Sequence, residues 1–435
     1  MNYQETLEYI HSTCWKGSRP GLERITELLG RMGNPEKGLR CVHVAGTNGK
    51  GSFCSMLSSV LMKAGYRVGM FTSPYIEEFE ERMQADGKNI SREMLAEVTE
   101  FVRPFADSME DSPTEFELIT AIGFEYFRRI GVDVVVLECG MGGRLDSTNV
   151  IEAPLLSVIT GIALDHTEYL GDTLAAIAGE KAGIIKENCP VLFGGESEEA
   201  RAVIARTAGE RNALFRCTDR SAVQIERCSP DGTDFSYLGY KDLHIALLGL
   251  YQPLNAANVI EAVELLRGRG LDIPDEALRE GLAAARWKGR FEKLLEKPLV
   301  FFDGGHNIEG VTAAVETAEA YFGGEKIDFV SGVMADKRYE EMAGLMARTA
   351  RKVYTVAPDN ARALDAESYA AVFRSLGVEA EGFASYKEAI TAALADSGRA
   401  KVPLLALGSL YAYAPFKKAL FEAAGIEKKT EDCGE

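Results

Sequence analysis

One short segment constrains the fold more than any other, because it joins a strand pattern, a glycine-rich loop and a helix pattern. "LRCVHVA" (39–45) is a short run rich in residues that favour a strand, and "GTNGKGS" (46–52) is the loop. "SFCSMLSSVLMKAG" (52–65) has the apolar spacing of a helix that ends at Gly65, and "YRVGMFT" (66–72) predicts the next strand. This strand–helix–strand order predicts an α/β fold with a mostly parallel sheet.

The same alternation continues along the chain. "VDVVVLECG" (132–140) and "PLLSVITGI" (154–162) are continuous apolar runs bounded by turn residues, as expected of strands buried on both faces of a parallel sheet. Residues 215–250 alternate polar and apolar around Pro-Asp-Gly, which predicts a small antiparallel hairpin excursion.

A basic, proline-ended segment, "RWKGRFEKLLEKP" (286–298), is interpreted as the connector between two domains. After it the strand–helix rhythm restarts at "LVFFDGGH" and continues to "VPLLALGSLY". We therefore expect an N-terminal domain with a P-loop-type, mostly parallel sheet over 1–288 and a smaller, doubly wound α/β domain over 296–435. The charged tail "IEKKTEDCGE" (426–435) is predicted to be frayed.

Composition excludes several classes of function. With 46% hydrophobic and 26% charged residues, the chain has the make-up of a soluble globular protein. No apolar run reaches the roughly 18 residues that a membrane helix needs. A net charge of −18 disfavours binding to nucleic acid or to anionic membranes. The eight cysteines form no C-x-x-C pair, and the N-terminus lacks a signal-peptide pattern, so reduced thiols and a cytoplasmic location are expected.

The glycine loop does not follow the common P-loop spacing G-x-x-x-x-G-K-[ST]. Gly51 follows Lys50, the hydroxyl comes one place late at Ser52, and Val44 stands where the first glycine belongs. The loop nevertheless follows a strand and opens a helix, whose free N–H groups and dipole attract phosphate. A cation at the start of a helix is unfavourable unless an anion binds beside it. These features predict a nucleotide phosphate site.

Three further side chains come at the carboxyl ends of predicted parallel strands, where open α/β sheets bind ligands. They are Ser73, Glu138 and His166. One crevice could hold all three, and hard oxygen ligands of this kind suit a magnesium nucleotide. Histidine is an unusual ligand for magnesium, so a structural His166 paired with Asp165 is the alternative.

Taken together, the motifs resemble the folylpolyglutamate synthase/dihydrofolate synthase family within the Mur ligase superfamily. The resemblance covers almost the whole chain, through "SRPGLERITELLGRMGNP" (18–35), "HVAGTNGKGS" (43–52), "FTSP" (71–74), "TEFE" (114–117), "LECGMGGRLDSTN" (137–149), "ITGIALDHTEYLGDTLAAIAGEKAGIIK" (159–186), "NAAN" (255–258), "GRFE" (289–292), "DGGHN" (303–307) and "GSLY" (408–411). The loop spacing is this superfamily's own version of the phosphate loop.

The resemblance implies ATP-dependent amide ligation. A carboxylate of folate or dihydropteroate takes the γ-phosphoryl group, and the amine of L-glutamate attacks the acyl phosphate. The implied small molecules are ATP and Mg²⁺, with K⁺ as a further possible cation. The resemblance also implies a monomer. Domain 1–288 would bind ATP and the pterin, and 296–435 would be the glutamate-ligase domain.

The resemblance also implies roles for individual residues. The ATP site would comprise Thr47, Asn48, Gly49, Lys50, Gly51, Ser52, Asn255, Arg290 and Asp303, with Lys50, Lys181 and His306 in catalytic roles. Metal would be held by Ser73, Glu138, His166 and a carbamylated Lys181; the alternative is an ordinary lysine paired with Glu180. Departures such as Tyr75 after "TSP" and "DGGHNIEG" in place of the usual DGAHNP leave the acceptor open.

Two other functions are weighed. A Mur cell-wall ligase would carry an extra N-terminal domain, and only about 45 residues precede the loop, fewer than a domain needs. A small-molecule kinase or ATPase would not need a second domain with "DGGHN".

Overall fold

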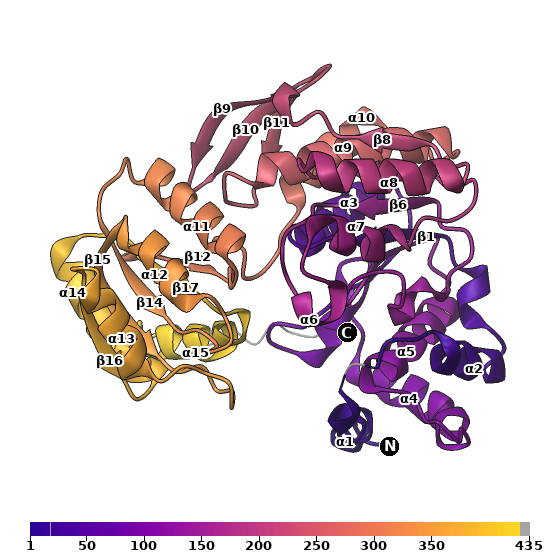
Figure 1. Ribbon diagram of the computed structural model, residues 1–435, viewed down its shortest axis with the longest axis horizontal. Helices are drawn as coiled ribbons and strands as arrows, with labels where there is room; N and C mark the ends of the chain where they lie inside the picture. Colours follow the sequence, from indigo (N-terminus) through magenta and orange to yellow (C-terminus); the bar gives the residue numbers. More distant parts are fainter. Residues whose placement is uncertain (18, 427–435) are drawn as a thin grey trace. The chain divides into compact units, whose positions relative to one another are not determined.

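The computed structural model describes residues 1–17 and 19–426, which divide into two compact units. Unit 1 comprises 1–226, 234–246 and 252–286, and unit 2 comprises 227–233, 247–251 and the chain from 287 onward. The two units are described separately below, with the element labels of Figure 1.

Unit 1 is built on an eight-stranded sheet. Its order is β4 (Lys88–Asn89), β3 (Met83–Ala85), β2 (Val68–Phe71), β5 (Val134–Glu138), β1 (Cys41–Ala45), β6 (Leu156–Ile159), β7 (Val191–Phe193) and β8 (Phe215–Cys217). The strands from β2 to β8 pair in parallel, and β3 and β4 add an antiparallel edge. This confirms the predicted mostly parallel sheet. Val44 of β1 is in register with Glu138, the last residue of β5, so the two strands end within one residue of each other.

Helices cover both faces of this sheet, which explains why its central strands β1 and β5 are buried throughout (Figure 1). On one face α3 (Lys50–Lys63) lies on β1, β2 and β5, α9 (Gln252–Gly268) lies on β6 and β7, and α10 (Asp275–Ala284) packs on α3. The opposite face carries α1 (Tyr3–His11), α2 (Glu23–Arg31), α4 (Arg92–Asp107), α5 (Glu115–Ile130), α7 (Leu174–Ala182) and α8 (Glu198–Glu210).

The excursion predicted over 215–250 is partly different in the structure. A separate three-stranded sheet is formed by β9 (Val223–Ser229), β10 (Gly232–Tyr237) and β11 (Tyr240–Ile245). Residues 215–217, however, are β8 at the edge of the main sheet. A three-residue strand has too little pattern of its own to be recognised, and it forms here because the edge of β7 offers it hydrogen-bond partners.

Unit 2 contains a six-stranded sheet covered by helices. The order is β12 (Glu292–Glu296), β13 (Leu299–Asp303), β17 (Leu404–Leu407), β14 (Ile327–Ser331), β15 (Ala350–Val356) and β16 (Glu379–Phe383). All pairs are parallel except β12 with β13. The helices are α11 (Ile308–Tyr321), α12 (Tyr339–Ala347), α13 (Ala366–Ser375), α14 (Tyr386–Ala400) and α15 (Tyr413–Ala423).

One part of the predicted connector is therefore wrong. Residues 292–296 form β12, an antiparallel edge strand of unit 2. The charged sequence "EKLLE" fits an edge strand, where charged side chains face water and discourage pairing with other chains. Pairing with β13 decides the structure here, and a local pattern does not contain that information.

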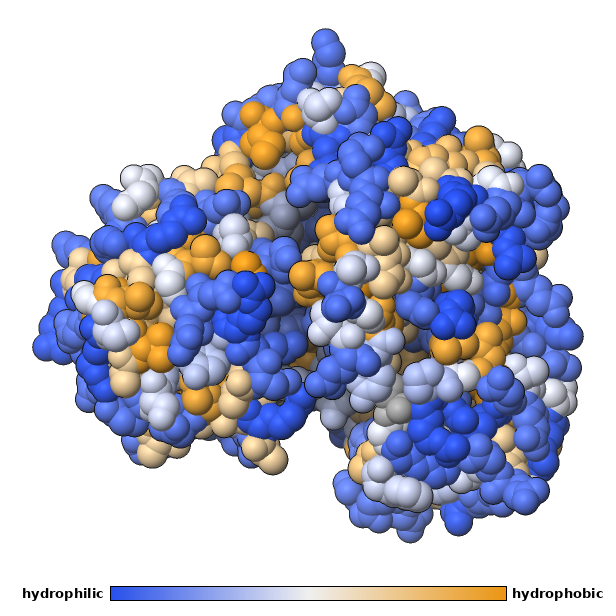
Figure 2. Space-filling view, in the orientation of Figure 1, coloured by the Kyte–Doolittle hydropathy of each residue, from blue (hydrophilic) through white to orange (hydrophobic). Residues whose placement is uncertain are grey.

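Figure 2 shows hydrophilic residues over most of the visible face, with hydrophobic residues in scattered groups. Within the described part of the chain, no helix is both long enough and apolar enough to span a bilayer. The described cysteines are free thiols. The predicted frayed tail from 427 on, Cys433, and Ser18 at the start of the lead-in motif lie outside the described residues.

Candidate active site

The glycine loop connects the end of β1 to the start of α3, as predicted. Gly49 has a φ of 87°, a left-handed conformation that L side chains rarely adopt. A Cβ atom at this position would lie 2.7 Å from Oδ1 of Asn255, so the loop backbone approaches the first turn of α9 closely. The helix begins at Lys50, and the N–H groups of its first turn have no intrahelical partner. The loop therefore combines close backbone approach with free amide donors.

Hydrogen bonds from the loop's hydroxyl groups and carbonyls fasten it to neighbouring segments. Thr47 Oγ1 accepts from the backbone N–H of Ala163 at 3.1 Å and donates to the carbonyl of the same residue at 3.2 Å. The carbonyl of Asn48 accepts from Thr160 Oγ1 at 2.7 Å. Ser52 is buried, and its Oγ accepts from Gln252 Nε2 at 3.2 Å. The displaced serine thus contacts α9, and the hydroxyl of Thr47 is already engaged by the loop after β6.

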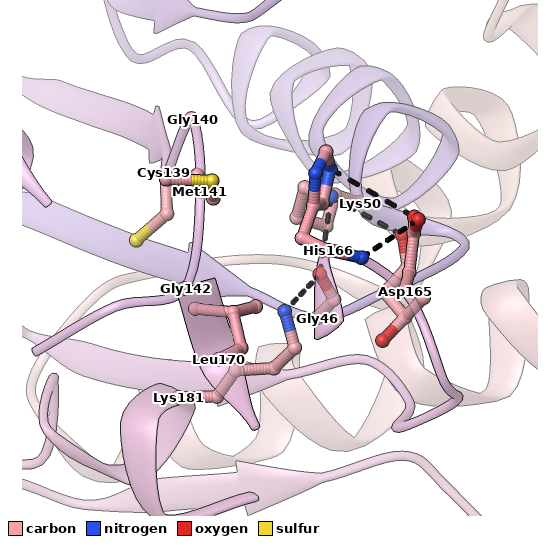
Figure 3. A pocket seen from close by; sticks show the side chains of 11 residues that line it. Gly46, Lys50, Cys139, Gly140, Met141, Gly142, Asp165, His166, Leu170 and Lys181 are labelled. Atoms are coloured by element: carbon pink, nitrogen blue, oxygen red, sulfur yellow. Dashed lines mark hydrogen bonds and ion pairs between the residues drawn. The ribbon is translucent and has the colours of Figure 1, made fainter. Parts of the chain in front are cut away.

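Two lysines from distant parts of unit 1 meet at a single carbonyl of the loop. Lys50 Nζ donates to the carbonyl oxygen of Gly46 at 3.1 Å, and Lys181 Nζ donates to the same oxygen at 2.9 Å (Figure 3). Lys181 is only 4% exposed. Burial, and then the nearby positive charge of Lys50, lower the pKa of Lys181 to about 7. A substantial fraction of Lys181 is therefore an uncharged amine near neutral pH.

The predicted metal ligands lie at strand ends, and the structure joins two of them directly. The buried carboxylate of Glu138, the last residue of β5, accepts from the backbone N–H of Ser73 at 3.2 Å. The other carboxylate oxygen lies 4.0 Å from Lys50 Nζ. Glu138 therefore links Ser73 to the glycine loop.

His166 takes a different position on the rim of the same region. Its φ is 50°, and its Nε2 lies 3.8 Å from a carboxylate oxygen of Asp165, the pairing weighed as the structural alternative. The imidazole is about half exposed, and it lines one pocket together with Lys50 and Lys181 (Figure 3). Over residues 1–17 and 19–426 there is no cluster of three or more His, Cys, Asp or Glu side chains able to hold a metal by themselves.

One wall of this pocket was not predicted from the sequence to belong to the site. The turn Gly140–Gly142, after β5, forms one of its walls. Asp146 shapes the turn, because one of its carboxylate oxygens accepts from the backbone N–H of Met141 at 2.8 Å and the other accepts from that of Thr148 at 3.1 Å. The signal that could have identified this wall was a second glycine-rich turn directly after a buried strand.

In unit 2, the remaining predicted residues gather at the end of β13. Asp303 Oδ1 accepts from the N–H of Gly305 at 2.7 Å, and Oδ2 accepts from the N–H of Phe291 at 2.8 Å and from Tyr251 Oη at 2.9 Å. His306 Nδ1 lies 3.1 Å from the carbonyl oxygen of Gly304. A Cβ at Gly304 would lie 3.1 Å from a guanidinium nitrogen of Arg290, so Arg290 belongs to the same cluster.

Comparison with known proteins now identifies the class. Residues 44–263 match the Mur ligase middle domain, and residues 289–410 match the Mur ligase glutamate ligase domain. The parallel sheet with its glycine loop and the second α/β unit thus define a ligase of the Mur type.

Individual relatives identify the family within this class of ligases. The chain is 42% identical to dihydrofolate synthase/folylpolyglutamate synthase of Bacillus subtilis, over 83% of this chain and 86% of that protein. It is 37% identical to folylpolyglutamate synthase of Lacticaseibacillus casei, over 97% of this chain and 99% of that protein. The structure of Escherichia coli FolC in complex with DHPP and ADP superposes with a TM-score of 0.86 at 29% identity, covering 98% of this chain and 99% of that one. The chain belongs to the folylpolyglutamate synthase/dihydrofolate synthase family, which confirms the resemblance found in the sequence.

Proposed function

We propose that the protein is an ATP-dependent amide ligase that adds L-glutamate to a carboxylate of folate or dihydropteroate through an acyl phosphate. The observation that carries this proposal is the pocket at Gly46, where a helix N-terminus and two lysines surround one loop. Such a pocket suits the phosphates of ATP, because backbone amides and cations oppose their charge. The relatives named above are ligases of this family, and one was solved with ADP.

The chemistry requires the loop to stabilise charge on the transferring phosphoryl group. The first-turn amides of α3 would bind the phosphate oxygens together with that of Gly49, while the N–H of Thr47 holds the loop in place by donating to the carbonyl of Gly161 at 2.8 Å. Lys50 Nζ, which donates to Gly46 and lies 4.0 Å from Glu138, would move from these acceptors to the phosphates. Gln252 and Asn255 support the loop from α9: Gln252 donates to Ser52 Oγ and accepts from Asn255 Nδ2, and Asn255 lies close to Gly49.

The donor set fits magnesium. Glu138 is a buried carboxylate at a strand end beside Ser73, and His166 lines the adjoining pocket. Magnesium commonly takes one or two protein carboxylates and completes its shell with water and phosphate oxygens, so a cluster of three acidic ligands is not required. We propose Ser73, Glu138 and His166 as the holders; the bound ion would neutralise phosphate charge.

Lys181 is proposed to be carbamylated. The uncharged amine would attack CO₂, form an N–C bond and release a proton, which leaves an anionic carbamate in place of a cation. The environment supports this reaction, because burial and Lys50 keep the pKa of Lys181 near 7 and so keep the nucleophilic form populated.

We propose that domain 1–288 binds ATP and the pterin and that domain 296–435 is the glutamate-ligase domain. In unit 2, Arg290 would supply a cation to the nucleotide, and His306 would contact its phosphates or ribose. Asp303 has acceptor bonds on both oxygens, so it would act by holding the turns that carry these two residues. We also propose that the enzyme acts as a monomer in the cytoplasm.

Two incorporation assays test the function. Labelled glutamate is supplied with ATP and either dihydropteroate or tetrahydrofolate, and ADP release is followed in parallel. Incorporation with one or both acceptors, and ADP release that needs acceptor and glutamate together, is expected. ADP release that does not depend on glutamate would instead indicate a kinase or ATPase, and incorporation with neither acceptor would reject a folate substrate.

A further inference from the structure

The glycine-rich loop after β5 packs directly against the peptide of Lys181. The N–H of Arg144 donates to the carbonyl of Glu180 at 2.7 Å. A Cβ added at Gly143 would lie 2.9 Å from the carbonyl oxygens of both Glu180 and Lys181. The loop and the end of α7 are therefore in contact with no room for a side chain between them.

One buried amide joins these two segments. Asn149 is 5% exposed and lies in a short 3₁₀ turn, Ser147–Val150. Its Nδ2 donates to the carbonyl of Arg144 at 3.0 Å and to the carbonyl of Gly183 at 3.1 Å. Gly183 is the residue that caps α7, two places beyond Lys181. Each of the two N–H bonds of one amide group thus holds a different segment.

Hydrogen bonds also hold the backbone of Asn149, so the position from which its side-chain amide extends is fixed. Its N–H donates to the carbonyl of Asp146 at 2.8 Å, and its carbonyl accepts from Lys186 Nζ at 3.0 Å. Asp146 in turn shapes the Gly140–Gly142 wall of the pocket. A continuous set of hydrogen bonds therefore runs from the pocket wall through Asn149 to the end of the helix that carries Lys181.

We propose that Asn149 is a positioning residue for the ligase reaction, whose amide fixes the end of α7 and thereby places the Lys181 amine at the Gly46 carbonyl. This inference rests on the proposed role of Lys181. A lysine side chain has several rotatable bonds, so its terminal atom is placed accurately only if its backbone is held. Residues that support a catalytic group in this way commonly affect activity about 10–100-fold when removed.

The test compares Asn149→Ala with Ser157→Ala. Ser157 is fully buried in β6, and its Oγ donates to the carbonyl of Ile184 at 2.9 Å, so its loss removes a hydrogen bond from the same segment without touching the loop. We expect Asn149→Ala to lower kcat about 10–100-fold while the KM for ATP changes less than about threefold. Ser157→Ala, with a comparable loss of thermal stability, should keep kcat within about twofold. Equal loss of kcat in both variants would show a purely structural role and overturn the proposal.

A double-mutant cycle with Lys181→Ala shows whether Asn149 acts through Lys181. If it does, adding Asn149→Ala to Lys181→Ala should cost little further activity, whereas independent effects would multiply. A multiplying effect would contradict the proposal. Carbamate on Lys181, measured by ¹³C NMR after addition of labelled bicarbonate, should fall in Asn149→Ala and remain in Ser157→Ala.

If Lys181→Ala proves fully active, the proposed role of Lys181 itself is wrong. Hydrogen exchange then still shows whether the Asn149 clamp, meaning the two hydrogen bonds from its amide to Arg144 and Gly183, holds the end of α7. The amides to follow are those of residues 183–185, which bond to carbonyls of the last turn of α7. Faster exchange in Asn149→Ala than in Ser157→Ala would support it, and equal exchange would reject it.

Discussion

Lys50 and Lys181 donate to the same carbonyl oxygen, that of Gly46, at 3.1 and 2.9 Å. The two ammonium groups repel each other, and the burial of Lys181 strengthens this effect. Positive charge is therefore concentrated at this carbonyl, and the repulsion together with burial holds the pKa of Lys181 well below its usual range. An anionic ligand relieves the repulsion, and so does the conversion of Lys181 to a neutral or anionic group.

Replacing Lys50 tests the first of these consequences. Lys50→Met removes the cation that would reach the phosphates, and kcat/KM for ATP should fall by about 100-fold or more, while the fold remains intact by circular dichroism. Lys63→Met is the matched control, since Lys63 lies on the same helix with an exposed side chain paired to Glu280, and it should behave as wild type. Normal turnover in Lys50→Met would refute the site.

Replacing Glu138 tests the proposed magnesium site. Glu138→Gln keeps the size of the side chain but removes the carboxylate charge beside Ser73. Turnover should be lost at ordinary Mg²⁺ concentrations, and the Mg²⁺ needed for half-maximal activity should rise by about tenfold or more where activity is measurable. An unchanged Mg²⁺ titration would show that Glu138 is not a ligand.

The lowered pKa of Lys181 makes stability depend on pH. Between its folded pKa of about 7 and the unfolded value of 10.5, the unfolded state binds more protons, so the free energy of unfolding should rise with pH across this range. Below pH about 7 the cost of burying the charge is fully present. In CO₂-free buffer, Lys181→Met should therefore be more stable than wild type at pH about 6, by on the order of a few kcal/mol, and the difference should shrink toward pH about 10. Urea unfolding at several pH values measures this, and parallel curves for the two proteins would contradict it.

The conformation of Gly49 predicts a severe effect of a single methyl group. Gly49→Ala must adopt a φ of 87° and also place its Cβ against Asn255. Gly65→Ala separates the two costs, because Gly65 has a similar φ of 89° with open space around it. We expect Gly65→Ala to lose about 1–2 kcal/mol of stability with normal kinetics. Gly49→Ala should also raise the KM for ATP about tenfold. Identical kinetics in the two variants would show that the contact with Asn255 is irrelevant.

The hydroxyl of Thr47 links the glycine loop to the loop that carries His166, and replacing Thr47 tests whether this link matters for activity. Thr47→Val keeps the shape but removes the hydroxyl that bonds both backbone groups of Ala163. The partly buried N–H of Ala163 would lose its acceptor, which costs about 1 kcal/mol, and kcat should fall about tenfold. Thr47→Ser should restore both quantities. A fully active Thr47→Val would show that the link serves stability alone.

Much of the fold followed from local patterns. The strand, loop and helix around Lys50 are recognisable because apolar periodicity and glycine act over a few residues. The strand β12 was missed because a charged edge strand forms only when its partner strand, β13, is present.

In the site, Glu138 and Ser73 were expected together because both follow strand ends, and the structure joins them by a hydrogen bond. The wall at Gly140–Gly142 and the clamp at Asn149 were not predicted, because they depend on how a loop packs against α7.

The sequence by itself determined that this chain has a phosphate-type loop in a parallel α/β sheet and that it belongs with the folate-linked Mur ligases. Backbone requirements for glycine and apolar burial are local, and they can be read residue by residue. Only the tertiary structure decided that Lys181 is buried beside Lys50 on one carbonyl. The pKa of a lysine depends on its solvation and on the charges around it, and folding brings these together from distant parts of the chain.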